Sequence, residues 1–140
     1  MTAYWLIKSE PDVWSWDDQM KAGKKGTHWD GVRNNQAAIH LRNMAKGDVC
    51  FFYHSGDERQ IVGLVEVTRT AYPDPGDETG RYVMVDVRAR EALKNPVPLT
   101  AIKADPKLQH LQLVRISRLS VSDVDQPSAR ILLKMGGLSG

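Results

Sequence analysis

The sequence predicts a single α+β domain built around a curved sheet or small barrel. Segments with strand and helix patterns follow one another without the regular alternation of strand and helix that a parallel sheet would require. The chain has 140 residues, 41% of them apolar and 26% charged, which is typical of one ordinary soluble globular domain. We therefore expect residues 1–140 to form one compact unit.

The first part of the chain predicts a strand followed by two helices. Residues 3–9 form a continuous aromatic and branched run, typical of a buried strand, and Pro11 lies just beyond its end. Ser15 is a suitable cap for a short helix that Gly23 ends. A second helix is predicted over residues 34–45, because apolar residues recur there at helical spacing.

Strand patterns dominate the middle of the chain. Residues 49–54 and 61–70 are expected to pair as an antiparallel hairpin, and residues 72–80, rich in proline and glycine, to form an exposed irregular loop. Residues 82–93 alternate apolar and charged side chains, which predicts a strand with one buried face.

The C-terminal part predicts short elements. Thr100 is expected to cap a helical turn that runs through residue 104, and Pro106 to start another. A last strand is predicted over residues 119–124 and a final helix over residues 127–135.

Composition excludes several classes of protein. With 19 basic and 17 acidic side chains, the net charge of +2 does not by itself indicate a basic surface. Cys50 lies in an apolar run and predicts a buried, inert thiol, and the four histidines show no ligand pairing, so we expect no metal and no cofactor. No apolar run is long enough to span a membrane, and the N-terminus does not resemble a signal peptide, so a cytoplasmic location is expected.

Four short segments carry polar and aromatic residues that a plain core does not need. Each lies near the end of a predicted strand, where loops commonly build ligand sites. The segments are Lys8-Ser9-Glu10-Pro11, Trp29-Asp30-Gly31-Val32-Arg33-Asn34, Phe52-Tyr53-His54-Ser55 and Ser117-Arg118-Leu119-Ser120.

In this order and spacing, the segments resemble the EVE domain family of the PUA-like superfamily, which includes the thymocyte nuclear protein group. The resemblance covers the chain from Ala3 to about Met135, and the runs YWLIKSEP and WDGVRN are its most specific parts. It implies a PUA-like mixed or antiparallel β pseudo-barrel flanked by short helices. It also implies binding to DNA or RNA that carries a modified base, with methylated or hydroxymethylated cytosine favoured.

The residue types suit that task. Trp29 offers a flat face on which an extruded base can stack, and Asp30 can accept a hydrogen bond from the amino group of cytosine. The expected base-binding pocket comprises Ser9, Trp29, Asp30, Val32, Tyr53, His54, Ser55, Ser117, Leu119 and Ser120. The residues expected to position phosphates are Lys8, Arg33, Asn34 and Arg118.

Other aromatic residues are expected in the core, namely Trp5, Trp14 and Trp16. Alternation along residues 51–54 predicts one pair of side chains in the core and the other pair at the pocket. On these assignments, Trp29→Ala should abolish oligonucleotide binding and leave the fold intact. Arg118→Ala should weaken binding and its salt dependence.

Two alternatives stay open. An enzyme acting on a modified nucleotide would need a catalytic group such as Ser117 with His54 and Asp30, although no nucleophile-elbow or phosphate-loop motif occurs. A protein-interaction module would use the loop at residues 72–80. The favoured prediction is a monomeric, non-enzymatic nucleic-acid reader with no membrane partner.

Overall fold

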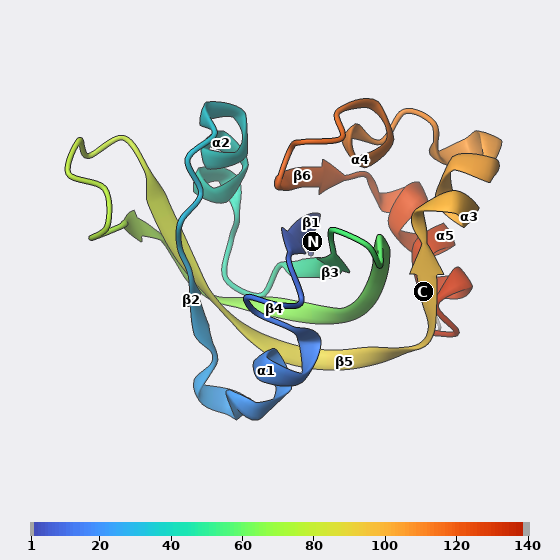
Figure 1. Ribbon diagram of the computed structural model, residues 1–140, viewed down its shortest axis with the longest axis horizontal. Helices are drawn as coiled ribbons and strands as arrows, with labels where there is room; N and C mark the ends of the chain where they lie inside the picture. The colour runs from blue at the N-terminus through green and yellow to red at the C-terminus, as the bar shows by residue number, and fades with distance from the viewer. Residues whose placement is uncertain (1, 139–140) are drawn as a thin grey trace.

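A strongly bent sheet of six strands organises the protein, whose computed structural model describes residues 2–138 (Figure 1). The strands are β1 (Tyr4–Ser9), β2 (Thr27–Trp29), β3 (Val49–His54), β4 (Gln60–Pro73), β5 (Val83–Pro98) and β6 (Val121–Val124). They lie in the order β2-β5-β4-β3-β1-β6. Strands β1 and β3 are parallel and the other neighbours are antiparallel, which confirms an α+β fold with a mixed sheet.

Short helices flank the sheet. They are α1 (Trp16–Lys21), α2 (Asn35–Asn43), α3 (Leu99–Ala104), α4 (Gln112–Arg115) and α5 (Gln126–Met135), with 3₁₀ turns at Gly23–Lys25 and Pro106–Leu108. The predicted caps of the first two helices are confirmed: Ser15 and Asp18 form a capping box at α1, and Asn34 Oδ1 accepts a hydrogen bond from Ala37 N at α2.

The two longest strands bend the sheet. Strands β4 and β5 change register at several points, and such bulges kink a strand and increase its twist. The strands at the two ends of the sheet, β2 and β6, do not pair with each other, while α2 contacts β6, β4 and β5. Helix α2 therefore bridges the open side of the bent sheet, and the result is a pseudo-barrel rather than a closed barrel (Figure 1).

Two hydrophobic clusters cover the opposite faces of β3. Phe52 belongs to the first cluster, together with Trp29 and side chains of α2. Phe51 and Tyr53 belong to the second, with side chains of α3 and α5. The predicted alternation is confirmed, but both faces of the strand are core, and every residue of β3 is buried.

Helix α1 is held against the sheet by Trp16. The indole ring lies directly over Gly63 of β4, where an added Cβ would stand 2.5 Å from the ring atoms. The backbone N–H of Trp16 donates to His54 Nε2 over 3.0 Å. A side chain at position 63 would therefore displace α1, and His54 is part of the helix attachment.

Several predicted boundaries are wrong. The second helix ends at Asn43, because Met44 already has an extended backbone. Helix α3 begins at Leu99, so Thr100 lies within it and does not cap it. The last strand begins at residue 121 instead of 119.

Three features of the fold were not expected from the sequence. Strand β2 and helix α4 were not predicted at all. Strand β4 continues to Pro73, and the following Asp74 is buried rather than exposed.

Among residues 2–138, no helix has the length and apolar character needed to cross a membrane.

Candidate functional site

A hollow of about 450 Å³, here called the first cavity, lies where the chain leaves β1 and β2. Its wall comes mainly from residues 8–14, which lead from β1 to α1, and from residues 27–34, which lead to α2. Ser120, just before β6, completes it. The sequence-predicted residues that line it are Lys8, Ser9, Trp29, Asp30, Val32, Arg33, Asn34 and Ser120.

Two indoles line the first cavity. Trp29, at the end of β2, is only 8% exposed, and its ring packs edge-to-face on Phe52 with 5.5 Å between centroids. Trp14 is half-buried, and its Nε1 donates to Gln19 Oε1 over 2.9 Å. Trp14 was expected in the core; it packs partly against the first cluster and also faces the cavity. Packing and hydrogen bonding thus hold both aromatic walls in place.

Some polar side chains of the first cavity already form hydrogen bonds within the protein, and others are open to a ligand. Ser9 Oγ donates to the carbonyl oxygen of Trp14 over 2.5 Å, and Asn34 caps α2. Asp30 is exposed and Ser120 half-buried. Asp30 and Ser120 are therefore the side chains best placed to bond to a ligand, while Ser9 and Asn34 shape the wall.

A buried carboxylate holds the loop that carries Asp30. Asp74, 3% exposed, accepts hydrogen bonds from Gly31 N and Arg33 Nη1, both over 2.9 Å, and from Gly76 N over 2.8 Å. Burial alone would raise the pKa of Asp74, but these donors lower it below its usual value. Arg33 thus lines the cavity while one of its nitrogens ties the segment to Asp74.

His28 is a wall residue that sequence reasoning gave little weight. Its Nδ1 lies 3.1 Å from Asp86 Oδ1 and 3.0 Å from Tyr72 Oη, and Tyr72 Oη donates to the same carboxylate oxygen over 2.5 Å. Burial and the bond to Asp86 raise the pKa of Tyr72 to about 12. The pairing of β2 with β5 places His28 opposite Asp86, a register that no local sequence pattern reveals.

Three other predicted pocket residues lie around a separate hollow. This second cavity, of about 220 Å³, is lined by Tyr53, Ser55 and Ser117, with Lys8 as a wall shared with the first cavity. Its remaining polar wall residues are Arg59 and Lys103, which the sequence did not single out. The segments predicted to form one pocket thus form two adjacent ones.

The remaining predicted residues line neither cavity. His54 is buried, accepts from Trp16 N at Nε2, and lies with Nδ1 2.9 Å from Glu58 Oε1. Leu119 is 2% exposed in the first core cluster, and Arg118 is exposed. Since both nitrogens of His54 are engaged and Asp30 and Ser117 line different cavities, the three residues do not form a catalytic triad.

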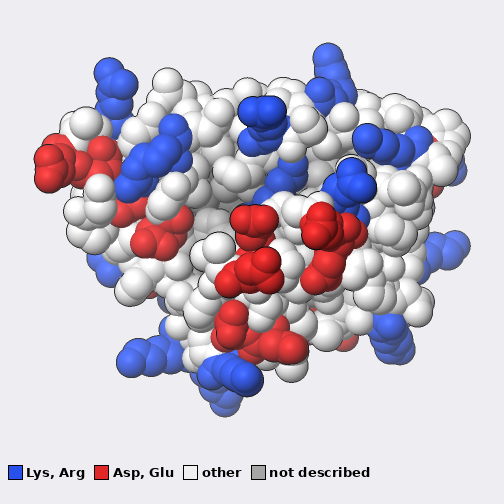
Figure 2. Space-filling view, in the orientation of Figure 1, with Lys and Arg blue, Asp and Glu red and all other residues white. Residues whose placement is uncertain are grey.

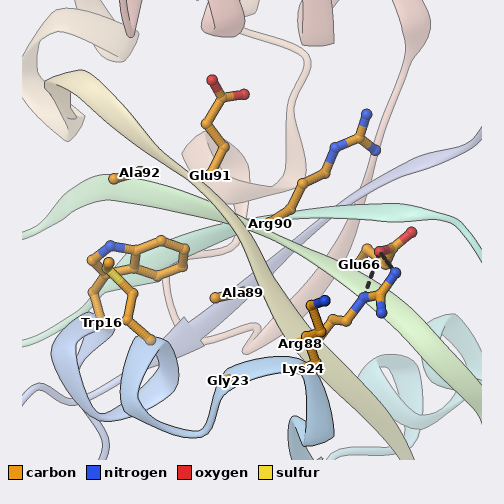
Figure 3. Close-up of a pocket in the computed structure, with 10 residues that line it drawn as sticks. Trp16, Gly23, Lys24, Glu66, Arg88, Ala89, Arg90, Glu91 and Ala92 are labelled. Atoms are coloured by element: carbon orange, nitrogen blue, oxygen red, sulfur yellow. Dashed lines mark hydrogen bonds and ion pairs between the residues drawn. The ribbon is translucent and has the colours of Figure 1, made fainter.

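A larger hollow of about 600 Å³ lies between α1 and strands β4 and β5 (Figure 3). Its wall mixes opposite charges, and Arg88 is paired with Glu66 over 2.6 Å. No sequence-predicted site residue lines it. Its charges are thus partly neutralised within the protein, and it offers fewer convergent polar groups than the first cavity.

Neither thiol nor metal chemistry is set up in the described part of the chain. Cys50 is fully buried, and burial followed by the charge of Asp48 raises the pKa of its thiol. Among residues 2–138, no group of three or more histidine, cysteine or acidic side chains could hold a metal ion.

Comparisons with known proteins agree with this architecture. The EVE domain model matches residues 3–135. Human thymocyte nuclear protein 1 (THYN1) is 30% identical over 167 aligned positions, which cover 96% of this chain and 74% of the relative. A Rhodopseudomonas palustris protein solved by NMR is 49% identical, with a TM-score of 0.92 and coverage of 97% of this chain and 94% of that chain.

A liganded structure is also similar. The crystal structure of human THYN1 in complex with DNA containing 5-methylcytosine gives a TM-score of 0.90 at 31% identity, and covers 99% of this chain and 100% of that chain. The family model and these alignments extend over nearly the whole sequence. The chain belongs to the EVE domain family.

Proposed function

We propose that this protein binds DNA or RNA by taking one extruded, modified base, with modified cytosine favoured, into the first cavity. The observation that carries the proposal is a hollow of about 450 Å³ with Trp29 and Trp14 in its wall and Asp30 at its rim. The 5-methylcytosine DNA bound by the human relative supports the same class of ligand.

Stacking on the indoles supplies affinity. Stacking a base on an aromatic side chain stabilises binding by about 1–3 kcal/mol, while extruding a base from a duplex costs a few kcal/mol. A base that contacts both Trp14 and Trp29 offsets most of that cost. Since both rings are already held by Gln19 and Phe52, little side-chain entropy is lost on binding.

Hydrogen bonds supply the identity of the base. A carboxylate such as Asp30 accepts from the amino group of cytosine but repels the carbonyl oxygen at the same place in thymine or uracil. Ser120 can donate or accept beside it. The free edge of a cytosine thus matches the free side chains of the first cavity.

The methyl group adds modest selectivity. Burying one extra carbon stabilises binding by about 0.8 kcal/mol, roughly a fourfold preference. Val13, 76% exposed at the rim, and buried Val32 are the aliphatic side chains of this wall. We therefore expect a preference of a few-fold for 5-methylcytosine over cytosine.

The test compares two tryptophans of equal burial. Trp29→Phe replaces a wall of the cavity with a smaller ring. Trp16→Phe changes an indole that is 7% exposed and lies outside the cavity, and whose Nε1 has no hydrogen-bond partner among residues 2–138. With labelled oligonucleotides that carry 5-methylcytosine, fluorescence anisotropy should show binding weakened roughly 3- to 10-fold by Trp29→Phe. Trp16→Phe should bind like the parent.

Three outcomes would overturn the proposal or part of it. Equal affinity of Trp29→Phe and the parent would refute the cavity as the base site. Absence of binding to any oligonucleotide would favour a protein-interaction module. Chromatography of the incubated oligonucleotide should show it unchanged, and a modified product would identify an enzyme instead.

A further inference from the structure

The second cavity lies next to the first, and Lys8 belongs to the walls of both. Three cationic side chains line it: Lys8 from β1, Arg59 from the turn between β3 and β4, and Lys103 from α3. None of the described residues that line it carries a carboxylate side chain. Elements distant in sequence therefore bring three positive charges to one hollow of about 220 Å³.

No salt bridge among the described residues joins these three cations to an acidic side chain. Within residues 2–138, the arginine salt bridges are Arg33 with Asp74 and Arg88 with Glu66, and the others involve histidine. Of the three ammonium donors of Lys8, one is used by the carbonyl oxygen of Ser117, at 2.7 Å. The cavity thus keeps donors and positive charge that an anion can use.

Burial makes an anionic ligand favourable here. Burial lowers the pKa of Lys8, because removing a cation from water without a counter-ion is unfavourable. Burial raises the pKa of Tyr53, and the positive charge of Arg59 opposes that rise, so the guanidinium acts on the tyrosine hydroxyl. An anion in the cavity would restore the lost solvation of Lys8.

Hydroxyl groups complete the lining. Tyr53, Ser55 and Ser117 add donors of the kind that contact phosphate oxygens in nucleic-acid complexes. One acidic group lies nearby: Glu10 Oε1 would be 3.2 Å from a Cβ added to Gly56, and Glu10 lines the first cavity. Because the carboxylate of Glu10 lies on the side of the first cavity and repels an anion, we expect an anion in the second cavity to lie closer to Arg59 and Lys103.

We propose that the second cavity binds a backbone phosphate of the strand whose extruded base occupies the first cavity, with Arg59 and Lys103 as its contacts on the outer side. The inference rests on the proposed function. Lys8 links the two sites, because one side chain contributes to both walls. Figure 2 shows Lys and Arg side chains along the upper part of the molecule and also at its lower edge, with Asp and Glu side chains concentrated near the centre.

Substitution of the two outer cations tests the proposal. Arg59→Gln and Lys103→Gln remove the charge while keeping a polar side chain with part of the aliphatic stem, and neither residue lines the first cavity. Together they should weaken binding of a single-stranded 5-methylcytosine oligonucleotide by roughly 5- to 30-fold at low salt. The slope of log K against log salt concentration should fall by about 0.7 for each lost contact. Affinity for 5-methylcytidine, which has no phosphate, should be unchanged.

Arg130→Gln combined with Lys134→Gln is the matched control. The pair removes one arginine charge and one lysine charge from α5, on exposed residues that line neither cavity, and should leave the salt slope unchanged. If the double variant keeps the affinity and salt slope of the parent, the phosphate site is refuted while base binding stands. If the parent binds neither oligonucleotide nor nucleoside, the proposed function fails and this inference fails with it.

Amide chemical shifts separate a backbone phosphate from a free anion. Titration with 5-methylcytidine should shift amides around the first cavity, those of Trp14, residues 29–34 and Ser120, whereas the oligonucleotide should also shift those of Ser55, Arg59 and Ser117. Inorganic phosphate at the concentration of the oligonucleotide phosphates should shift the second set weakly. Equal saturation by inorganic phosphate alone would show a site for free anions and overturn the proposal, as would an unshifted second set with oligonucleotide.

Discussion

Trp29 belongs to the core and to the first cavity at the same time. Its ring packs on Phe52, and it is 8% exposed. Truncating a buried tryptophan to alanine costs about 3–5 kcal/mol of stability. The sequence alone suggested that Trp29→Ala would leave the fold intact, but the burial of Trp29 predicts that this variant is strongly destabilised. The smaller change to phenylalanine keeps an aromatic ring against Phe52 and is the better probe of binding.

Arg59 is the residue whose backbone is most clearly under strain. Its φ is +47°, and within residues 2–138 every other residue with positive φ is a glycine. The left-handed conformation costs a non-glycine residue roughly 1–2 kcal/mol, and a glycine at this position would avoid that cost. The greater flexibility of glycine in the unfolded chain offsets part of this stabilisation. We expect Arg59→Gly to be more stable than Arg59→Gln by about 0.5–1 kcal/mol in urea unfolding.

Binding should not follow stability at this position. Both variants lose the guanidinium of Arg59, so both should lose the same oligonucleotide affinity, although Arg59→Gly is expected to be the more stable of the two. Equal unfolding midpoints for the two variants would show that no strain is stored there. Such strain is common at binding sites, where function rather than stability selects the residue.

At the scale of elements, Asp74 anchors the segment from Asp30 to Asn34. Asp74→Asn leaves a single acceptor oxygen for the donors of Gly31, Arg33 and Gly76. We expect a loss of about 1–3 kcal/mol in stability, because buried donors lose their acceptor, and weaker base binding. Urea unfolding and anisotropy measure the two effects. Asp57→Asn, which changes an exposed carboxylate, should alter stability by less than about 0.5 kcal/mol.

The effect of Asp74 has a definite pH dependence. Burial raises the pKa of Asp74, but hydrogen bonds from Gly31, Arg33 and Gly76 outweigh burial and lower that pKa in the folded protein. Its ionised form therefore stabilises the fold above the pKa of the unfolded chain. That contribution is lost as the pH falls below about 4 and passes through the folded pKa. The stability advantage of the parent over Asp74→Asn should therefore be constant from pH 5 to 7 and shrink toward pH 2. An advantage independent of pH over this range would contradict the assigned role.

Elements with a strong local signal were predictable from the sequence. The apolar run of β3 has the predicted limits, and Ser15 caps α1 as expected. Strand β2 has three residues, too few for any periodicity, and is formed only by pairing with β5. Strand β5 continues past Pro96, because the ladder with β4 is irregular between Ala92 and Val97 and needs no donor there.

The candidate site was predictable in its segments but not in its grouping. Trp29 and Asp30 do lie together at a cavity, since they are neighbours in sequence. Whether Tyr53 and Ser117 line the same cavity depends on the relative positions of β1, β3 and the segment before β6, which no local sequence pattern reveals. In the structure they line the second cavity, and Lys8 lines both cavities. The monomeric state and the cytoplasmic location stay predictions.

At the scale of the whole molecule, the two core clusters support different parts of the structure. The first cluster supports Trp29 and α1, whereas the second joins the sheet to α3 and α5. Adjacent residues of β3, Phe51 and Phe52, are both 0% exposed and point into different clusters. Substituting Phe51 or Phe52 therefore removes a similar amount of packing from one face of β3 or from the other.

We therefore expect Phe51→Leu and Phe52→Leu to lower stability by similar amounts, about 1–2 kcal/mol each. Their effects on binding should differ. Phe52 contacts the rings of both Trp29 and Trp16, and of these Trp29 is the wall of the first cavity. Loss of the Phe52 ring leaves Trp29 free to move and should weaken binding of 5-methylcytidine several-fold. Phe51 touches neither indole, and its variant should bind the nucleoside like the parent at temperatures where both are folded. Equal weakening by the two substitutions would mean that binding follows global stability, and that the first core cluster does not specifically preorganise the cavity.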